Sequence, residues 1–212
     1  MQRRSRLGAN RGRTFGVALA MGLHLTAPAA AVTLGLALTA LALSATPAGW
    51  VVAGTAPGDY EFAVDSTIAA TGKRSASITA KPGARPDGFG TLMQKIAADD
   101  YRGGRWRLSA YMRTEGANRA QMWMRIDGPL HKVLGFDNMG SRPVTGTTEW
   151  TQYDIVLDVP PESIAIAFGF FLNGAGKVWA DSFRLEKVAA TVPTTPTESV
   201  LPRSATNLDF EE

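Results

Sequence analysis

The chain has 212 residues, a formal net charge of +3 and no cysteine. This length allows one domain of ordinary size with extra segments at its ends. The lack of cysteine excludes thiol catalysis, disulfide chemistry and cysteine-ligated metal sites. The positive charge belongs to the start of the chain, because without the five arginines of the first 13 residues the net charge becomes −2. The charge therefore predicts no nucleic-acid partner.

Residues 1–48 have the composition of an export signal or a membrane anchor. The basic start is followed by an apolar helical run, rich in Ala and Leu, from residue 15 to about residue 45. A spanning helix needs roughly 20 apolar residues, so this run is long enough to cross a bilayer, although Pro28 divides it. A cleaved signal and a retained anchor both remain open. Both place the following domain outside the cytoplasm, with the arginines inside.

Residues 49–188 consist of short runs in which apolar and polar residues alternate, with many aromatics and with Gly, Pro and Asn between the runs. This pattern predicts an all-β domain, a two-sheet antiparallel sandwich of the jelly-roll type. The predicted strands are 60–65, 75–80, 90–97, 105–114, 120–126, 132–136, 151–159, 164–172 and 177–186.

Alternation within these strands separates a core face from a polar face, because successive side chains of a strand point to opposite sides. Residues 164, 166, 168 and 170 are predicted to share one face. Trp150 and Trp179 are assigned to the core or to a sheet edge. The other side chains assigned to the core are Trp106, Met122, Met124, Ile166 and Phe168.

A candidate binding surface is predicted on the polar face. An aromatic ring beside planar hydrogen-bonding groups suits a sugar, whose C–H face stacks while its hydroxyls need donors and acceptors. An alternative places Trp123 in the core, with Arg125 and Asp137 as an ion pair that fixes the strand register. The residues assigned to the ligand are Tyr111, Trp123, Arg125, Asp137 and Asn138, with Gln94 from an earlier strand.

Catalytic and metal-binding candidates are few. His131 follows a proline in a turn, where an exposed histidine is ordinary. Asp127 and Asp137 come from neighbouring strand ends and could form a carboxylate pair for glycoside hydrolysis, or cap turns. Asp181 could ligate a structural calcium, although a turn partner is the favoured interpretation. We therefore expect a non-catalytic domain without a cofactor, apart from that calcium.

Residues 189–212 begin as a Thr/Pro linker. The last six residues, NLDFEE, alternate between polar and apolar types and are typical of the first strand of a further unit.

Three segments of the domain resemble carbohydrate-binding-module-like jelly rolls, the galactose-binding-domain-like group. Residues 72–78 (GKRSASI) and 178–186 (VWADSFRLE) are similar to the opening and closing strands of that group. Residues 146–169 match its pattern of Trp, Tyr, Val-Pro and Phe-Gly. The block 88–139 resembles a narrower bacterial subgroup, sometimes attached to transcriptional regulators. The resemblance implies a sandwich that binds ligands through aromatics on its concave sheet or its loop tips.

The resulting hypothesis is an exported binding or sensing module for a carbohydrate or cell-envelope glycan, with the membrane as a second partner of the N-terminal segment. The alternatives are a membrane-tethered protein-interaction domain, or an accessory domain of a larger regulator or hydrolase. The oligomeric state is left open.

Overall fold

The computed structural model describes residues 46–85 and 87–195. The predicted helix of the leader and the predicted strand at 207–212 lie outside these residues. Within them, no helix is long and apolar enough to cross a membrane. The described elements are β1 (Val51–Gly54), η1 (Pro57–Asp59), β2 (Tyr60–Asp65), β3 (Ser75–Ala80), β4 (Phe89–Ala97), β5 (Gly104–Asp127), η2 (Pro129–His131), β6 (Val133–Asp137), β7 (Val144–Val159), β8 (Ala165–Asn173) and β9 (Lys177–Val188).

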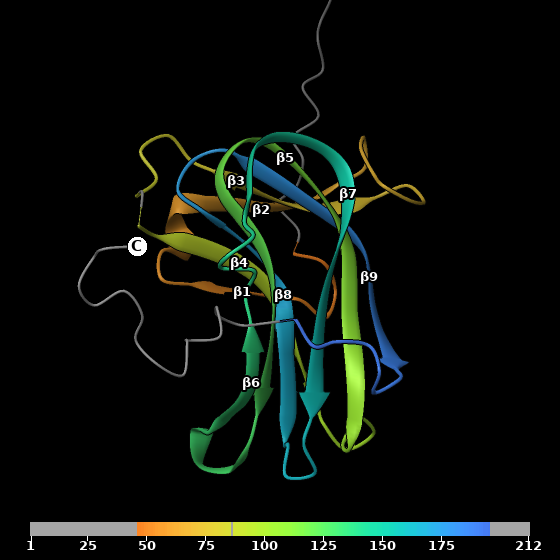
Figure 1. Ribbon diagram of the computed structural model, residues 1–212. Coiled ribbons are helices and arrows are strands. Elements are labelled where there is room, and N and C mark those ends of the chain that lie inside the picture. The colour runs from red at the N-terminus through yellow and green to blue at the C-terminus, as the bar shows by residue number, and fades with distance from the viewer. Residues whose placement is uncertain (1–45, 86, 196–212) are drawn as a thin grey trace, which may run out of the picture. The chain divides into compact units, whose positions relative to one another are not determined.

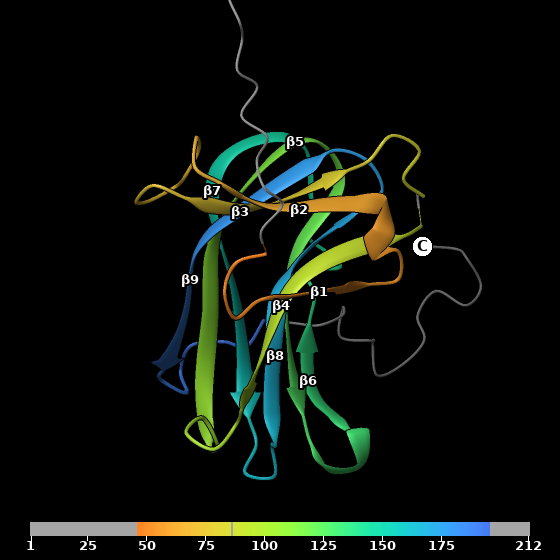
Figure 2. The same cartoon turned by 180° about the vertical axis from the view of Figure 1, so that it is seen from behind.

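These strands form two antiparallel layers with the core between them, which confirms the predicted β-sandwich (Figure 1). One layer consists of β1, β4, β8, the second half of β5 and β6, and it is called the groove layer because its outer face carries the groove described below. The opposite layer consists of β2, β3, β9, the first half of β5 and β7. In the view from behind, β4 lies nearer to the viewer than β8 in the groove layer, and β2 lies nearer than β9 in the opposite layer (Figure 2).

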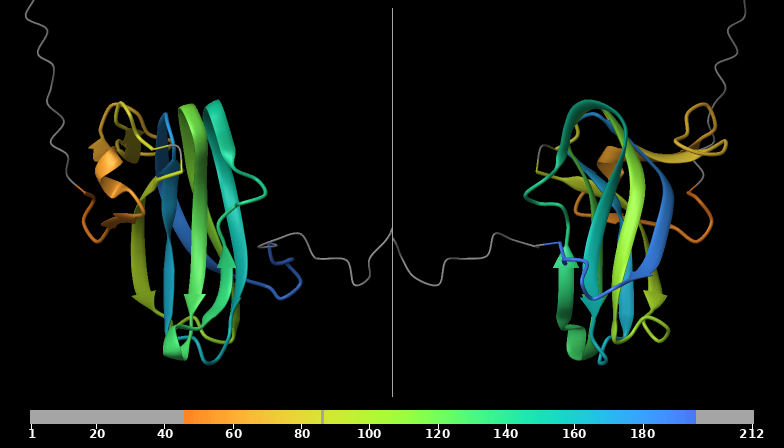
Figure 3. Two further views of the ribbon diagram at one scale, coloured as in Figure 1. Left: turned by 90° about the vertical axis from the view of Figure 1, so that its left-hand side faces the viewer. Right: turned by 45° about the vertical axis from the view of Figure 1, so that its right-hand side comes forward.

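The 24-residue strand β5 belongs to both layers and joins them. Residues 105–115 pair with β9, whereas residues 119–127 pair with β8. Between these halves the register with β7 shifts three times, and Gly116 has a φ of +56°, a conformation that glycine adopts without steric cost. Strands β5 and β7 bend together over one end of the domain (Figure 3).

The core is formed by the inward side chains of both layers. Leu108 and Met112 from the opposite layer meet Met122 and Met124 from the groove layer, and all four are fully buried. The predicted core positions of Met122, Met124, Ile166 and the almost fully buried Phe168 are therefore confirmed, whereas Trp106 is only half-buried and packs against this core. Burial of this many large apolar side chains supplies the main driving force for a domain of this size.

The strand boundaries differ from the prediction in several places. Strand β7 begins at Val144, seven residues before the predicted start at residue 151. The predicted strands 105–114 and 120–126 are one strand, because the intervening Gly and Asn form a bend and not a loop. Strand β1 was not predicted, since four residues are too few to show alternation. Ile164 precedes β8 and is 49% exposed, so the prediction that it faces the core is wrong.

The first residues of the predicted linker lie against the domain. The backbone N–H of Thr195 donates to the carbonyl of Val156 at 2.9 Å. The guanidinium of Arg105 donates to the carbonyl of Ala190 at 2.8 Å and also binds the carbonyl of Val192. The segment 189–195 is thus fixed on β7 and β5, away from the groove layer.

Candidate functional site

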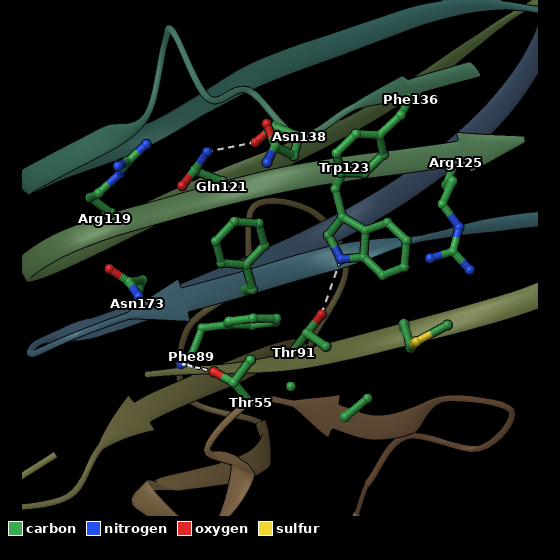
Figure 4. Close-up of a pocket in the computed structure, with 14 residues that line it drawn as sticks. Thr55, Phe89, Thr91, Arg119, Gln121, Trp123, Arg125, Phe136, Asn138 and Asn173 are labelled. Atoms are coloured by element: carbon green, nitrogen blue, oxygen red, sulfur yellow. Dashed lines mark hydrogen bonds between the residues drawn. The ribbon is translucent and has the colours of Figure 1, made fainter. Parts of the chain in front are cut away.

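A groove of about 560 Å³ lies on the outer face of the groove layer. It is lined by residues of β1, β4, β8, β5 and β6, so every strand of that layer contributes to it (Figure 4). On β5 the lining residues are Arg119, Gln121, Trp123 and Arg125. These are alternate positions of one strand, and the intervening side chains are buried in the core.

Trp123 lies in the middle of the groove. Its indole extends across β8 toward β4, where Nε1 donates to Oγ1 of Thr91 at 3.1 Å (Figure 4). The Thr91 hydroxyl in turn donates to the carbonyl of Phe170 at 2.8 Å. Thr91 and Phe170 are both buried, and Trp123 is 9% exposed. The ring is therefore held in one orientation before any ligand arrives.

Gly169 of β8 lies between Trp123 of β5 and Met93 of β4 in the strand register. A Cβ at this position would lie 2.1 Å from the Leu92 carbonyl oxygen. Only glycine permits this close approach of β4 to β8. Because Gly169 has no side chain, nothing projects from β8 into the space beside the indole.

Phenylalanine rings line the groove on either side of Trp123. Phe89 and Phe171, from adjacent strands, have ring centroids 5.3 Å apart and planes tilted by 54°. Phe136 of β6 lines the opposite side (Figure 4). A concave surface of aromatic rings with a few polar groups is the usual composition of a small-molecule or saccharide site.

Side-chain amides provide the polar groups of the groove. Gln121 donates through Nε2 to the backbone carbonyl of Asn138 at 2.6 Å. Asn173 donates through Nδ2 to the carbonyl of Gly88 at 2.9 Å. These bonds fix both amides and use only their nitrogens. Within the described part of the chain, the amide oxygens of Gln121 and Asn173 and the side-chain amide of Asn138 have no hydrogen-bond partner, so all three are available to hydroxyl groups.

A charged cluster occupies one end of the groove. Arg125 binds Asp127 through two hydrogen bonds, of 2.6 and 3.2 Å, and Lys95 lies 3.3 Å from the same carboxylate. Burial opposes ionisation of Asp127, but the hydrogen bonds from Arg125 and Lys95 outweigh it and lower the pKa of this carboxyl below its ordinary value. An acid of this kind stays ionised, whereas a glycosidase general acid requires a raised pKa.

Asp137 lies beneath the groove and not in it. Its carboxylate is fully buried and receives two hydrogen bonds from Arg142, at 3.2 and 2.7 Å, and one from the N–H of Met139 at 2.8 Å. The predicted alternative of an Arg125–Asp137 ion pair is wrong, because the two residues have different partners. Asp137 fixes the connection between β6 and β7, and it is unable to reach a ligand in the groove.

Tyr111 and Gln94 were expected to share the polar face with Trp123, and this expectation is wrong. Tyr111 is in the first half of β5 and pairs with Gln152 and Asp181, so it belongs to the opposite layer. Gln94 alternates with Thr91 and Met93, which line the groove, and therefore points to the other side of β4. Of the predicted set, Trp123, Arg125 and Asn138 are the residues that line the groove.

Sequence reasoning missed several lining residues. Alternation along β4 places Phe89, Thr91 and Met93 on one face, and alternation along β8 places Phe171 and Asn173 on one face. This signal was present, but the order of strands in a layer was needed to bring the two faces together.

Asp181 serves as a turn partner. Its carboxylate accepts hydrogen bonds from the N–H groups of Ala70 and Thr71, both at 2.9 Å, and from Ser182 at 2.6 Å. Among the described residues, no group of three or more His, Asp or Glu side chains could hold a metal ion. His131 is exposed in η2, as predicted.

The chain is similar to known proteins in sequence and in fold. It is 42% identical over 167 residues to the uncharacterized HTH-type transcriptional regulator YbfP of Bacillus subtilis (strain 168). The match covers 77% of this chain and 57% of that protein, so the chain spans little more than half of the relative's length. No protein-family model matches the chain.

Two solved structures share the fold at low sequence identity. One is the CBM22-1–GH10 part of Clostridium thermocellum endo-1,4-β-D-xylanase 10B in complex with xylohexaose, with a TM-score of 0.50, 12% identity and coverage of 73% of this chain and 29% of that one. The other is the enzymatically active domain of tailspike protein 4 of bacteriophage CBA120, with a TM-score of 0.51, 13% identity and coverage of 66% and 20%. The domain therefore has a carbohydrate-binding-module-like β-sandwich fold.

Proposed function

We propose that the groove binds a saccharide and that the domain is a binding or sensing module without catalytic activity of its own. The observation that carries this proposal is the Trp123 indole, fixed by Thr91 in the middle of a groove lined by three further aromatic rings. A sugar ring can place its C–H face on such a surface while its hydroxyls reach the amides of Gln121, Asn138 and Asn173.

The fold supports this assignment only in a general way. The structure solved with xylohexaose shares the sandwich, but 12% identity transfers neither its ligand nor its binding residues. The assignment therefore depends on the groove of this chain. The two carboxylates that a hydrolytic mechanism would use, Asp127 and Asp137, are each bound to an arginine. This arrangement favours binding over hydrolysis.

The proposal is tested by calorimetry of the full-length chain with a panel of neutral and acidic oligosaccharides. Trp123→Ala should weaken binding roughly 30-fold, the effect of losing a central aromatic anchor. The matched control is Tyr111→Ala, which removes an aromatic ring from the outer face of the opposite layer and should leave the affinity unchanged. Failure of the whole panel to bind, or equal losses in both variants, would contradict the proposal.

The relative suggests a wider context for the module. Because 77% of this chain matches a protein named as an HTH-type regulator, we propose that the module is the ligand-sensing part of a longer protein. Isolation of the native protein would test this. A polypeptide that continues into a further domain beyond residue 212 supports the proposal, and a native product ending at Glu212 contradicts it.

We also propose that residues 1–48 direct the domain out of the cytoplasm, either as a cleaved signal or as an anchor. Alkaline phosphatase fused after residue 195 is active only when exported. An inactive fusion with a stable, full-length product would contradict the proposal. The mass of the exported N-terminus distinguishes cleavage from anchoring.

A further inference from the structure

We infer that the groove selects acidic saccharides, in which sugar rings carry carboxylate groups, and that Arg119 is a specificity residue that binds one of these carboxylates. The inference rests on the saccharide-binding function proposed above and adds the chemical class of the ligand.

The first observation is the charge of the groove. Among the described residues that line it, two are arginines and none is Asp or Glu. The nearby carboxylates are already bound: Asp127 by Arg125 and Lys95, and Asp137 by Arg142 beneath the sheet. The surface that a ligand meets is therefore positive, and a concave wall of low polarity concentrates that potential.

The second observation is the state of Arg119. This exposed side chain makes one hydrogen bond, from Nη2 to the carbonyl of Gly140 at 3.1 Å. Within the described part of the chain it has no carboxylate partner, so most of its five donors remain for a ligand. A planar guanidinium fits a carboxylate through two parallel hydrogen bonds, which hydroxyl groups do not reproduce.

The arginines in the first half of β5, on the outer face of the opposite layer, are arranged differently. Arg105 binds Asp158 at 2.7 Å, Arg107 binds Glu186 at 3.2 Å, and Arg113 lies 3.7 Å from Glu149. These three arginines of β5 thus form ion pairs with carboxylates, whereas Arg119 of the same strand has no carboxylate partner among the described residues.

The other end of the groove is also positive. The cluster of Arg125, Lys95 and Asp127 holds two cations and one anion, which leaves one positive charge. Arg119 and Arg125 are six residues apart on β5, which corresponds to roughly 20 Å along an extended strand. This spacing exceeds the length of one sugar ring. It therefore suits an oligosaccharide lying along β5, with acidic groups near both ends of the groove.

The test compares oligogalacturonates and oligomannuronates with the same oligosaccharides after reduction of their carboxyl groups to alcohols. For the full-length chain, we expect at least one acidic form to bind about tenfold or more tightly than its reduced counterpart, as for hydrogen bonds to charged groups. The preference should fall as ionic strength rises, because the groove is open to solvent.

Arg119→Gln should remove most of this preference, because it should weaken binding of the acidic form much more than binding of the reduced form. Arg184→Gln, which removes an exposed cation from the outer face of the opposite layer, is the matched control and should leave the preference intact. Equal or tighter binding of the reduced forms, or of neutral oligosaccharides alone, would overturn the acidic specificity and leave saccharide binding in place. Absence of binding to any saccharide would instead remove the proposed function itself.

Discussion

Trp123 and Trp179 occupy comparable positions on the two layers of the sandwich. Each faces outward from its sheet, and each donates its indole N–H to a side-chain oxygen, Trp123 to Thr91 at 3.1 Å and Trp179 to Asp65 at 2.9 Å. Both side chains are almost fully buried, with exposures of 9% and 6%, and they differ in their neighbours. Lys177 Nζ lies 4.2 Å from the ring centre of Trp179, whereas the ring of Trp123 lines an open groove.

The comparison shows that an outward position does not by itself make a side chain available to a ligand. Trp179 of β9 contacts the cations of Lys177 and Arg113 and donates to Asp65. These contacts link β9 to Arg113 of β5 and to Asp65 of β2. Around Trp123, the absence of a side chain at Gly169 and the neighbouring phenylalanines leave a hollow. The two indoles therefore have different predicted roles, one in stability and one in binding.

The largest loss of stability is expected when Asp137, the buried carboxylate under the groove, loses its partner. Arg142→Met should lower the free energy of unfolding by about 3–5 kcal/mol, because it leaves a fully buried charge without its partner. Urea unfolding measures this change.

The double variant Asp137→Asn with Arg142→Met is the control for the first prediction. It removes the charge together with its partner and should recover part of the lost stability. A loss below about 1 kcal/mol in the single variant would show that Asp137 is hydrated and accessible, as a groove residue would be.

The second prediction separates the two tryptophans directly. Trp179→Ala should lower the free energy of unfolding by roughly 2–4 kcal/mol, because it exposes buried contacts and leaves Asp65 without one donor. Its saccharide affinity, measured where the variant is fully folded, should equal that of the unaltered chain. A loss of affinity as large as that of Trp123→Ala would break the comparison.

Local patterns predicted the fold and part of the site. The alternation that separates Met122 and Met124 from Gln121 and Trp123 needs only the period of a strand, so both faces were assigned correctly. The location of Tyr111 depended on whether 105–114 and 120–126 lie in one layer. Their common strand changes layers at Gly116, a long-range event that alternation does not encode.

Hydrogen-bond partners were the other unpredictable part. Asp127 and Asp137 carry the same side chain at the ends of neighbouring strands, yet one binds Arg125 two residues away and the other binds Arg142 across a turn. The choice depends on side-chain directions in three dimensions. The same applies to Arg119, whose lack of a carboxylate partner within the described residues becomes visible only once the surrounding strands are placed.

The smallest of these effects concerns the pH dependence contributed by Asp65, the partner of Trp179. Burial raises the pKa of this carboxyl, but hydrogen bonds from Thr67 and Trp179 and the charge of Lys177 outweigh it and lower the pKa from 3.8 to about 2. Because the folded value is the lower one, ionised Asp65 stabilises the fold fully above about pH 4. That stabilisation, about 2 kcal/mol, is lost as the pH falls through 2.

Unfolding by urea at pH 6 and near pH 2 measures this contribution as a difference between the unaltered chain and Asp65→Asn. The variant should be less stable at pH 6 and nearly equal in stability near pH 2, because about half of the folded Asp65 is protonated there and most of its charge-dependent stabilisation is already lost. Glu61→Gln, at an exposed carboxylate of the same strand, is the matched control and should keep the acid-dependent loss. If Asp65→Asn lost the same stability at both pH values, the hydroxyl and indole donors around Asp65 would matter more than its charge. The neighbours of Trp179 would then be held in place by hydrogen bonding and packing, with little contribution from the ion pair between Asp65 and Lys177.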